Sequence, residues 1–399
     1  MLPNEKQSIP ISQIQHKESA SLLLGCGSCH LKTSCGGLQL DGSVVHCLDF
    51  CSCEDPNSCD VVCSHAPQRF VRRLNEVEGF GLDGIELKPA VAWPRLPVWL
   101  PIIEKPMLGL NMALIQFGVL PINAACKRTA DGLVALTASE LNQKFGGTPA
   151  GGWVLTGVDQ DYRIEQIWRL GRAGRERLFA GLKASGIVAA TSPNFSLIAD
   201  VPRSDNLHAR KRIGIVWSEM NMAGLPTALH VNARNQADFD FYAELIKGTG
   251  CRTISFEFAT GAGASEAMDR YLSRLARLAA DIAWPLSIFV RGGVHRYETL
   301  HRIFETVTQL DTNAHMKARK RQTLVPATGD RRHRWITDPS IALMPVGEIF
   351  QLTVEQCRQV DRFARQSPKL SASPRISKLR VAQVDLSAND ESPQLRLAF

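Results

Sequence analysis

The chain has 399 residues, of which 44% are hydrophobic and 21% charged, and its formal net charge is +7. This composition is typical of a globular protein with a full core, as one large domain with or without an appendage. No stretch approaches the roughly 20 apolar residues that span a bilayer, and the N-terminus lacks the pattern of a signal peptide, so we expect a cytoplasmic protein.

The N-terminal region is rich in cysteine, with eight of the 11 cysteines between residues 26 and 63. These eight are Cys26, Cys29, Cys35, Cys47, Cys51, Cys53, Cys59 and Cys63. Because cytoplasmic thiols stay reduced, such spacing favours a metal site over disulfides. The sequence therefore predicts a metal-binding module within residues 1–92, and the remaining Cys126, Cys251 and Cys357 are expected to act as small hydrophobic residues.

The spacing of these cysteines leaves the metal open. C-x2-C-x5-C from Cys26 resembles the last three ligands of the iron–sulfur loop in endonuclease-three-type DNA glycosylases. The remaining ligand of that loop lies seven positions upstream, where this chain has Ser19. C-x3-C-x1-C from Cys47 departs from the C-x3-C-x2-C of radical S-adenosylmethionine enzymes. We favour one four-iron, four-sulfur cluster, with or without a zinc beside it, over two zinc ions. A purely structural role, stapling a segment too small to own a core, is the alternative.

From about residue 97, short β-rich apolar runs alternate with longer amphipathic segments, a pattern typical of repeated βα units. The expected strands are 97–103, 112–120, 152–158, 187–200, 227–233, 253–259, 286–293 and 311–318. The expected helices include 162–186, 238–250 and 264–284. Strands and helices in this number predict an α/β protein with a (β/α)8 TIM-type barrel over residues 93–345, followed by a C-terminal helix and tail over 346–399.

Polar residues close several of the expected strands, and active sites of such barrels lie at the C-terminal strand ends. The candidates are Asp159, Asp161, Asn194, Asp200, His230, Asn232, Glu257, Arg291, Lys317 and Arg319. Glu257 stands between Phe256 and Phe258, so its side chain should point the opposite way, into the barrel. An unpaired charge there is costly, which favours a functional role for Glu257.

Structural roles remain open for four of these candidates. Asp159 and Asp161 could cap the helix that follows them, because a carboxylate accepts from the free amides of a first turn. Asp200 could fix a turn or pair with Arg203, and His230 could be a hydrogen-bonded core histidine.

Positive charge is concentrated in four runs, at residues 69–73, 208–212, 317–322 and 330–335. Two of these runs lie near expected strand ends, where their cations could contact phosphates beside the active site. In the run 317–322 these cations include Lys317, Arg319 and Arg321. The sequence therefore predicts a nucleic-acid partner, with His333 and Trp335 as possible stacking groups.

Several segments resemble the tRNA-guanine transglycosylases. "LPVWLPIIEKP" resembles their opening barrel strand, and "ALHVNARNQADFDFYAELI", "TISFEFATG" and "PLSIFVRGGVHRYETLHRIFETV" follow in a similar order. "SPNFSLIADVPRSDN" resembles an uncharacterised family of phage and bacterial proteins. A cysteine-rich N-terminus before the barrel resembles the DNA-acting relatives, which include enzymes that insert deazaguanines into DNA and an anti-phage glycosylase that excises glucosylated hydroxymethylcytosine. The resemblance covers about residues 95 to 340 and implies a barrel that acts on an N-glycosidic bond.

The chain departs from the transglycosylase pattern at three places. The first catalytic aspartate of the family lies in D-S-G-G-F/Y-Q, and the matching Asp159 in "TGVDQD" lacks the glycine pair. The family's nucleophilic aspartate falls near the eighth strand, where this chain offers Asp311 and Asn313. The family's C-terminal zinc motif is absent, since only Cys357 remains there, so guanine exchange on tRNA is not expected.

Taken with the charge, the resemblance implies a DNA glycosylase that removes a modified base from phage DNA and leaves an abasic site. Asp159, Asp200 and Glu257 would stabilise or attack the cationic sugar or activate water. The flipped base would be read by polar side chains of the rim, namely Asp161, Asn194, His230, Asn232 and Arg291. This chemistry needs no cofactor of its own.

Three alternatives remain open from the sequence. The first is a transglycosylase that exchanges bases in DNA or tRNA. The second is a non-enzymatic, metal-containing nucleic-acid-binding protein. The third, a metal-dependent hydrolase or lyase acting on a small molecule, is disfavoured by the lack of an H-x-H or H-E-x-x-H pair.

Overall fold

The computed structural model describes the chain in several stretches. They are residues 39–40, 43–44, 73, 75–86, 91–130, 132–197, 203–234, 236–259, 265–293, 296–325 and 334–366. All eight cysteines of the predicted metal site, and Asp200, lie outside these residues. The first two stretches are the short antiparallel strands β1 (Gln39–Leu40) and β2 (Ser43–Val44).

Eight parallel strands of the described chain form one sheet in the order β3–β12–β11–β10–β9–β8–β7–β4. They are β3 (Trp99–Pro101), β4 (Gly118–Pro121), β7 (Trp153–Thr156), β8 (Ile187–Thr191), β9 (Thr227–His230), β10 (Thr253–Glu257), β11 (Ser287–Arg291) and β12 (Thr306–Asp311). The two end strands approach each other where Ile102 bridges Val119 and the Ile103 N–H donates to the Val119 carbonyl at 2.7 Å. The protein is therefore a mixed α/β fold with a nearly closed eight-stranded barrel, as predicted.

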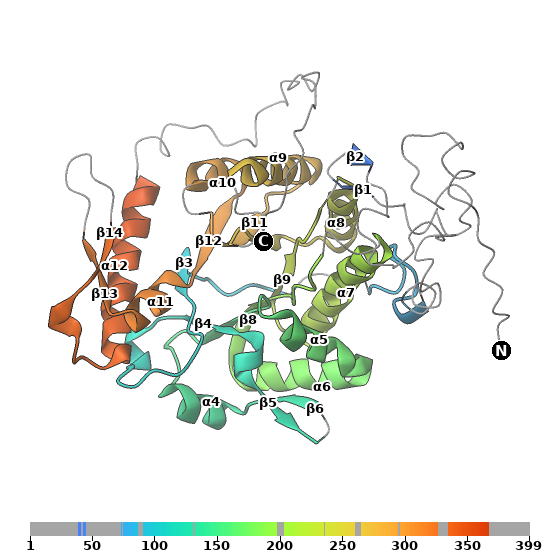
Figure 1. The fold of residues 1–399 in the computed structure, drawn as a ribbon. Coiled ribbons are helices and arrows are strands. Elements are labelled where there is room, and N and C mark those ends of the chain that lie inside the picture. Colours follow the sequence, from blue (N-terminus) through green and yellow to red (C-terminus); the bar gives the residue numbers. More distant parts are fainter. Residues whose placement is uncertain are drawn as a thin grey trace, which may run out of the picture.

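Helices surround this ring of strands, as Figure 1 shows. They are α4 (Ala138–Phe145), α5 (Asp161–Arg169), α6 (Gly171–Ala184), α7 (Arg203–Met222), α8 (Gln236–Thr249), α9 (Ser265–Asp281), α10 (Tyr297–Ile303), α11 (Asn313–Arg319) and α12 (Val346–Gln366). Two antiparallel hairpins lie outside the barrel, β5 (Cys126–Thr129) with β6 (Gly132–Ala135) and β13 (Gln322–Val325) with β14 (Arg334–Thr337). None of the described helices has the length and apolar character needed to cross a membrane.

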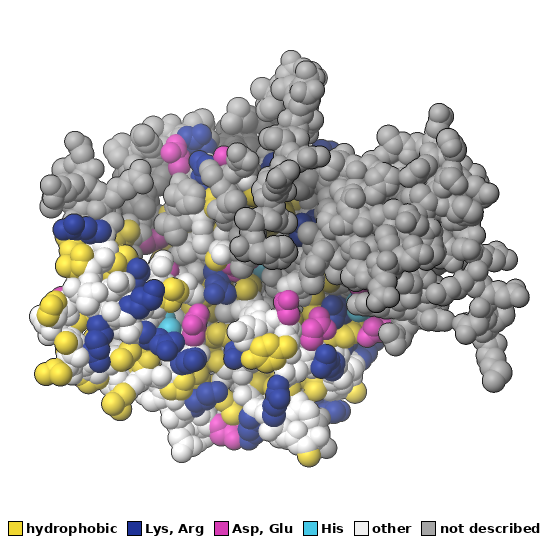
Figure 2. Space-filling view, viewed as in Figure 1, with side chains coloured by type: hydrophobic (Ala, Val, Ile, Leu, Met, Phe, Trp, Pro, Cys, Tyr) yellow, Lys and Arg dark blue, Asp and Glu magenta, His cyan; other side chains and the backbone are white. Residues whose placement is uncertain are grey.

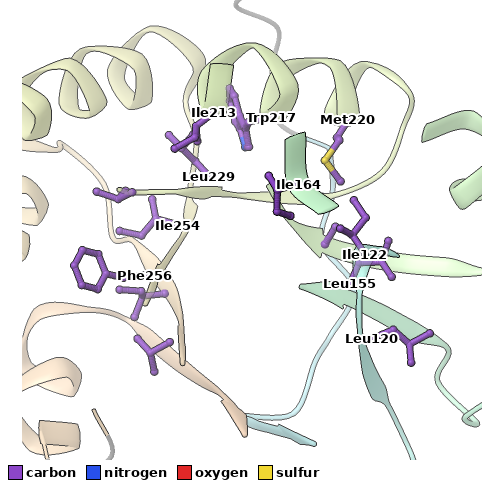
Figure 3. Close-up of a cluster of buried hydrophobic side chains, with 14 of the residues drawn as sticks. Leu120, Ile122, Leu155, Ile164, Ile213, Trp217, Met220, Leu229, Ile254 and Phe256 are labelled. Atoms are coloured by element: carbon purple, nitrogen blue, oxygen red, sulfur yellow. The ribbon is translucent and has the colours of Figure 1, made fainter. Parts of the chain in front are cut away.

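The core has an inner and an outer part, because successive side chains of a strand point to opposite faces. In the outer part, Ile213 and Trp217 of α7 pack on strand residues such as Leu229 (Figure 3). The Trp217 indole N–H also donates to the Thr227 carbonyl at 2.8 Å, so the buried ring is satisfied. Each such buried side chain contributes about 1.5–3 kcal/mol of stability.

The inner part fills the barrel with smaller apolar side chains. It consists of Leu100, Ile102, Phe117, Val119, Val154, Ala189, Ala228, Phe289 and Leu310. The ring of Trp93, which precedes β3, lies 5.5 Å from the ring of Phe289 and packs against this inner cluster. Polar residues also occur on the inner face, among them His230 and Glu257 at the last residues of β9 and β10 and Ser255 in the middle of β10.

Two strand predictions were wrong. The eighth strand is β12 at residues 306–311, whereas most of the predicted 311–318 belongs to α11. The three consecutive β-branched residues that open "TVTQLD" favour a strand at residues 306–311. Within the predicted 112–120, only β4 is strand; Met112–Leu114 is a 3-10 helix, capped where the Asn111 side chain accepts from the Ala113 N–H at 3.1 Å.

The predicted helix 162–186 is two helices, and the predicted strand 187–200 is shorter. Gly171 adopts a φ of +67°, a left-handed conformation that glycine tolerates, and it separates α5 from α6. Strand β8 ends at Thr191, after which residues 192–197 cross the rim without regular structure.

The basic run 208–212, one of the four concentrations of positive charge in the sequence, is not a surface cluster. Its cations lie on α7 and are all buried. The Arg210 guanidinium pairs with the Asp238 carboxylate at 3.0 Å. Lys211 Nζ donates to the Gly81 carbonyl at 2.8 Å, within the described segment 75–86. These cations therefore have an ion-pair or hydrogen-bond partner inside the protein, where an unpaired charge would be costly.

Candidate active site

Glu257 ends β10 with its side chain on the inner face, as the alternation in the sequence predicted. Its neighbours Phe256 and Phe258 both belong to the outer cluster. The Glu257 side chain is only 6% exposed, and its Oε1 accepts from the Ala259 N–H at 3.0 Å. Its Oε2 is buried without a hydrogen-bond partner. Burial raises the pKa of Glu257 to about 6, against the opposing effects of Arg291 and the Ala259 amide.

Arg291 ends the neighbouring strand β11 and is the register partner of Glu257. Arg291 Nη1 lies 3.9 Å from Glu257 Oε2, which is too long for a hydrogen bond. The Arg291 side chain is 24% exposed, and its Nε is buried without a partner. The two charged groups thus attract each other but leave hydrogen-bonding capacity for a bound molecule.

Two glycines after Arg291 shape this part of the rim. Gly292 has a φ of +81° and Gly293 a φ of +70°, both in the left-handed region. A Cβ on Gly292 would lie 2.8 Å from the Ala259 nitrogen. "RGG" therefore lets the turn after β11 pass close to the backbone of Ala259, just beyond the strand ends where Glu257 and Arg291 are register partners.

His230 ends β9 and shares the inner face with Ala228, two residues earlier. Its ring is fully buried, and burial lowers its pKa to about 3, so the imidazole is neutral at physiological pH. His230 Nδ1 lies 3.1 Å from the Ser255 hydroxyl on β10. Its Nε2 has no hydrogen-bond partner among the described residues. Ser255 was missed by the sequence analysis, although it lies two residues before Glu257 and so shares its face.

Asp159 and Asp161 follow β7 and behave differently. Asp159 Oδ1 accepts from the Gln160 N–H at 2.8 Å and pairs with Arg163 at 3.3 Å, while its Oδ2 is buried without a partner. Asp161 begins α5 and accepts from the Ser196 hydroxyl at 2.6 Å. Asp159 thus keeps an unused carboxylate oxygen, and Asp161 ties its loop to the loop after β8.

Asn194 and Asn232 meet across the loops that follow β8 and β9. Asn232 Nδ2 donates to Asn194 Oδ1 at 2.7 Å and to the Phe195 carbonyl at 3.2 Å. The Asn194 N–H donates to the Gly157 carbonyl at 2.9 Å. These contacts order the rim on the β7–β9 side of the barrel.

The three predicted phosphate contacts lie on or just after α11, which follows β12. Lys317 Nζ is 5.5 Å from the centre of the Trp335 ring, and Arg319 is exposed. Arg321 instead donates from Nη1 to the Ile341 and Met344 carbonyls, at 2.8 and 2.9 Å. Figure 2 shows Lys and Arg side chains among hydrophobic ones on the side that carries α11 and α12.

Asp311, at the place that the resemblance implied for a nucleophile, lies on the outer side of the barrel. Its Oδ2 accepts from the Trp99 indole N–H at 3.2 Å and its Oδ1 from the Asn313 N–H at 2.8 Å. Trp99 belongs to the outer cluster, and Leu310 before Asp311 to the inner one. Burial raises the pKa of Asp311.

Among the described residues, no group of three or more His, Cys, Asp or Glu side chains is placed to hold a metal ion. The three described cysteines, Cys126, Cys251 and Cys357, are all buried. Burial raises the pKa of Cys126 and of Cys251 to about 12, as expected of thiols that act as small hydrophobic groups.

No protein-family model matches the sequence, and no curated protein matches it. Among solved structures, the chain is similar to a nitroalkane oxidase from Streptomyces ansochromogenes, with 14% identity over 67% of this chain and 87% of that chain. The TM-score of 0.26 is too low for this likeness to support an argument about fold or function.

Proposed function

We propose that this protein is a DNA glycosylase that cleaves the N-glycosidic bond of a modified base drawn into the barrel mouth. One observation carries the proposal: Glu257 and Asp159 each keep a carboxylate oxygen that is buried and without a hydrogen-bond partner. Such oxygens are costly unless a bound molecule uses them. Both residues follow strand ends at the same rim, where barrel enzymes place their chemistry.

The two carboxylates suit a reaction that develops positive charge on a sugar. Asp159 would lie beneath the deoxyribose and stabilise the cationic transition state. Glu257, with a pKa of about 6, would accept a proton from water near neutral pH. The water oxygen bonds to C1′ as the C1′–N bond breaks, and the bonding electrons leave with the base. The proton held by Glu257 then passes to the released base, so atoms and charges balance.

The charge distribution supports DNA as the substrate. Exposed Arg319, and Lys317 above Trp335, offer phosphate contacts near the end of β12. Asn194, Asn232 and Arg291 would contact the flipped base or its substituents. A role in defence against phage with modified DNA rests on the resemblance alone.

We include in the proposal a metal at the N-terminal cysteines, as an iron–sulfur cluster or zinc. Elemental analysis and colour of the purified protein test this part, since a four-iron cluster is brown and zinc is colourless. Replacing Cys26, Cys29 or Cys35 with Ser is expected to reduce both metal content and soluble yield. A stable and fully active variant without metal would contradict that expectation.

Mass spectrometry of what the protein liberates from unmodified DNA and from phage DNA with modified bases tests the reaction. We expect free modified base and alkali-sensitive abasic sites with the wild type, and neither with Glu257→Gln. Asp240→Asn, on the exposed face of α8, is the matched control. Release of the modified base only when a second base is supplied would indicate base exchange instead. Binding of DNA without release of any base would indicate a non-enzymatic protein.

A further inference from the structure

His230 and Ser255 form a buried polar pair inside the barrel. They are register partners on β9 and β10, and His230 Nδ1 lies 3.1 Å from Ser255 Oγ. Ser255 is 3% exposed, so its hydroxyl hydrogen needs an acceptor within the protein. Among the described residues His230 Nδ1 is the acceptor within reach. Glu257 does not compete, because its Oε2 has no partner and its Oε1 accepts from Ala259.

The hydrogen-bond partners of Ser255 and His230 determine which nitrogen of the His230 ring carries the proton. A neutral imidazole carries one N–H, and the other nitrogen is an acceptor. If the Ser255 hydroxyl donates to Nδ1, that nitrogen is the acceptor, and the proton of the ring is on Nε2. Burial lowers the pKa of His230 to about 3, which keeps the ring neutral at physiological pH.

We infer that Ser255 holds His230 in the Nε2–H tautomer, so that the barrel offers a fixed hydrogen-bond donor to a carbonyl oxygen of the bound base. His230 lies on the inner face of the barrel. Glu257 lies on the same face, two residues beyond Ser255 and nearer the strand end. Ser255 is thus a positioning residue, which acts on the ligand through His230. The identity of the ligand as a nucleobase rests on the proposed function.

The fixed donor selects a chemical class of base. A ring carbonyl, as in hypoxanthine or the pyrimidines, accepts the Nε2–H bond. An amino group at the same place presents a second donor and leaves the Nε2–H unpaired, which costs about tenfold in affinity. The site therefore takes bases with a carbonyl group and disfavours adenine and its amino-only relatives.

Nitrogen-15 NMR of the full-length protein labelled at histidine tests the tautomer directly, without any substrate. The His230 signals are assigned by their loss in His230→Gln. We expect the Nε2–H pattern in the wild type and in Ser255→Thr, which keeps the hydroxyl. Ser255→Ala should give a mixture of tautomers. An Nδ1–H or doubly protonated ring in the wild type, or an unchanged pattern in Ser255→Ala, would overturn the inference.

Titration with free hypoxanthine and adenine tests the ligand class, because hypoxanthine has a carbonyl at C6 and a proton at N1 where adenine has an amino group at C6 and an acceptor at N1. We expect hypoxanthine to bind about tenfold tighter and to shift the His230 Nε2 signal. Ser255→Ala should reduce this preference, and Ser255→Thr should restore it. Equal binding, or no binding of either base, would overturn the ligand assignment. Absence of base release from DNA, with the tautomer and the preference intact, would instead defeat only the proposed glycosylase reaction.

Discussion

Glu257 Oε2 and Arg291 Nη1 face each other across 3.9 Å on register partners of β10 and β11. A closed salt bridge would have satisfied the carboxylate and removed it from chemistry. In the open pair, burial of Glu257 outweighs the attraction of Arg291 and raises the pKa of the carboxyl to about 6. Glu257 Oε2 and Arg291 Nε both keep hydrogen-bonding capacity for a ligand.

Wild-type protein should lose unfolding free energy as pH rises through the range where Glu257 ionises, and Glu257→Gln should abolish this loss. Burial raises the pKa of Glu257 from its ordinary 4.5 to about 6, so between these values the folded state keeps a proton that the unfolded state releases. Stability of the wild type should therefore fall by about 2 kcal/mol as pH rises from 4.5 to above 6. Urea unfolding of both proteins at pH 4 and pH 7.5 measures this. Parallel pH profiles would contradict the prediction.

Arg291→Ala should shift the pH dependence of base release. The Arg291 charge lowers the pKa of Glu257, so its removal should raise that pKa further above 6. If Glu257 accepts the proton from water, the rising limb of the pH–rate profile should move to higher pH. Arg291→Lys should leave the limb near its original place. An unmoved limb in the alanine variant would mean that another group titrates.

Asp159→Asn should lower the rate of base release by about 10²-fold or more, because the amide cannot stabilise a cationic sugar. Affinity for DNA should remain close to that of the wild type, since size and most hydrogen bonding persist. Alkaline strand cleavage and fluorescence anisotropy on the same samples measure the two effects, with Asp240→Asn as control. If Asp159→Asn released base at the wild-type rate, Asp159 would not be a catalytic residue.

Lys317→Ala combined with Arg319→Ala should weaken binding to DNA of many sequences alike. The slope of log affinity against log salt should fall by roughly 1 to 2, as expected for one or two lost phosphate contacts. Lys183→Ala, an exposed change on α6, serves as the control. Unchanged binding would place the DNA on another face.

Arg321→Ala should act on stability instead of DNA affinity. Its guanidinium donates to the carbonyls of Ile341 and Met344, and these acceptors would lose a charged donor. We expect a loss of about 1 to 3 kcal/mol in urea unfolding, with an unchanged salt slope for DNA binding. If Arg321→Ala kept wild-type stability and reduced the salt slope of DNA binding, Arg321 would be a phosphate contact after all.

Asp238→Asn should be strongly destabilising, because it removes the charge of a fully buried carboxylate that pairs with the buried Arg210 guanidinium at 3.0 Å. Breaking a buried pair on one side costs about 3 to 5 kcal/mol. The double change Arg210→Met with Asp238→Leu should cost less than the single one, since no charge stays buried. Urea unfolding of the three proteins decides this, and a single change costing under about 1 kcal/mol would contradict it.

The sequence "TISFEFA" was enough to determine that Glu257 faces away from Phe256 and Phe258, because successive side chains of a strand point to opposite faces. In the same way, regular βα spacing determined the barrel class. Those inferences depend on local geometry, which the sequence carries directly. The eighth strand was misplaced because its signal, "TVTQLD", is short and directly adjoins α11.

Only the tertiary structure decided which charges are available. The run 208–212 has the composition of a solvated surface, yet Asp238 and a carbonyl of 75–86 come from elsewhere in the chain to pair with Arg210 and to accept a hydrogen bond from Lys211. Likewise Arg321 is occupied by a distant loop, while Arg319 is exposed. The 3.9 Å separation of Glu257 and Arg291 depends on the pairing of β10 with β11, two strands about 30 residues apart in the sequence. Partners distant in sequence leave no local pattern, so burial and pairing of charge emerge only when the chain is folded.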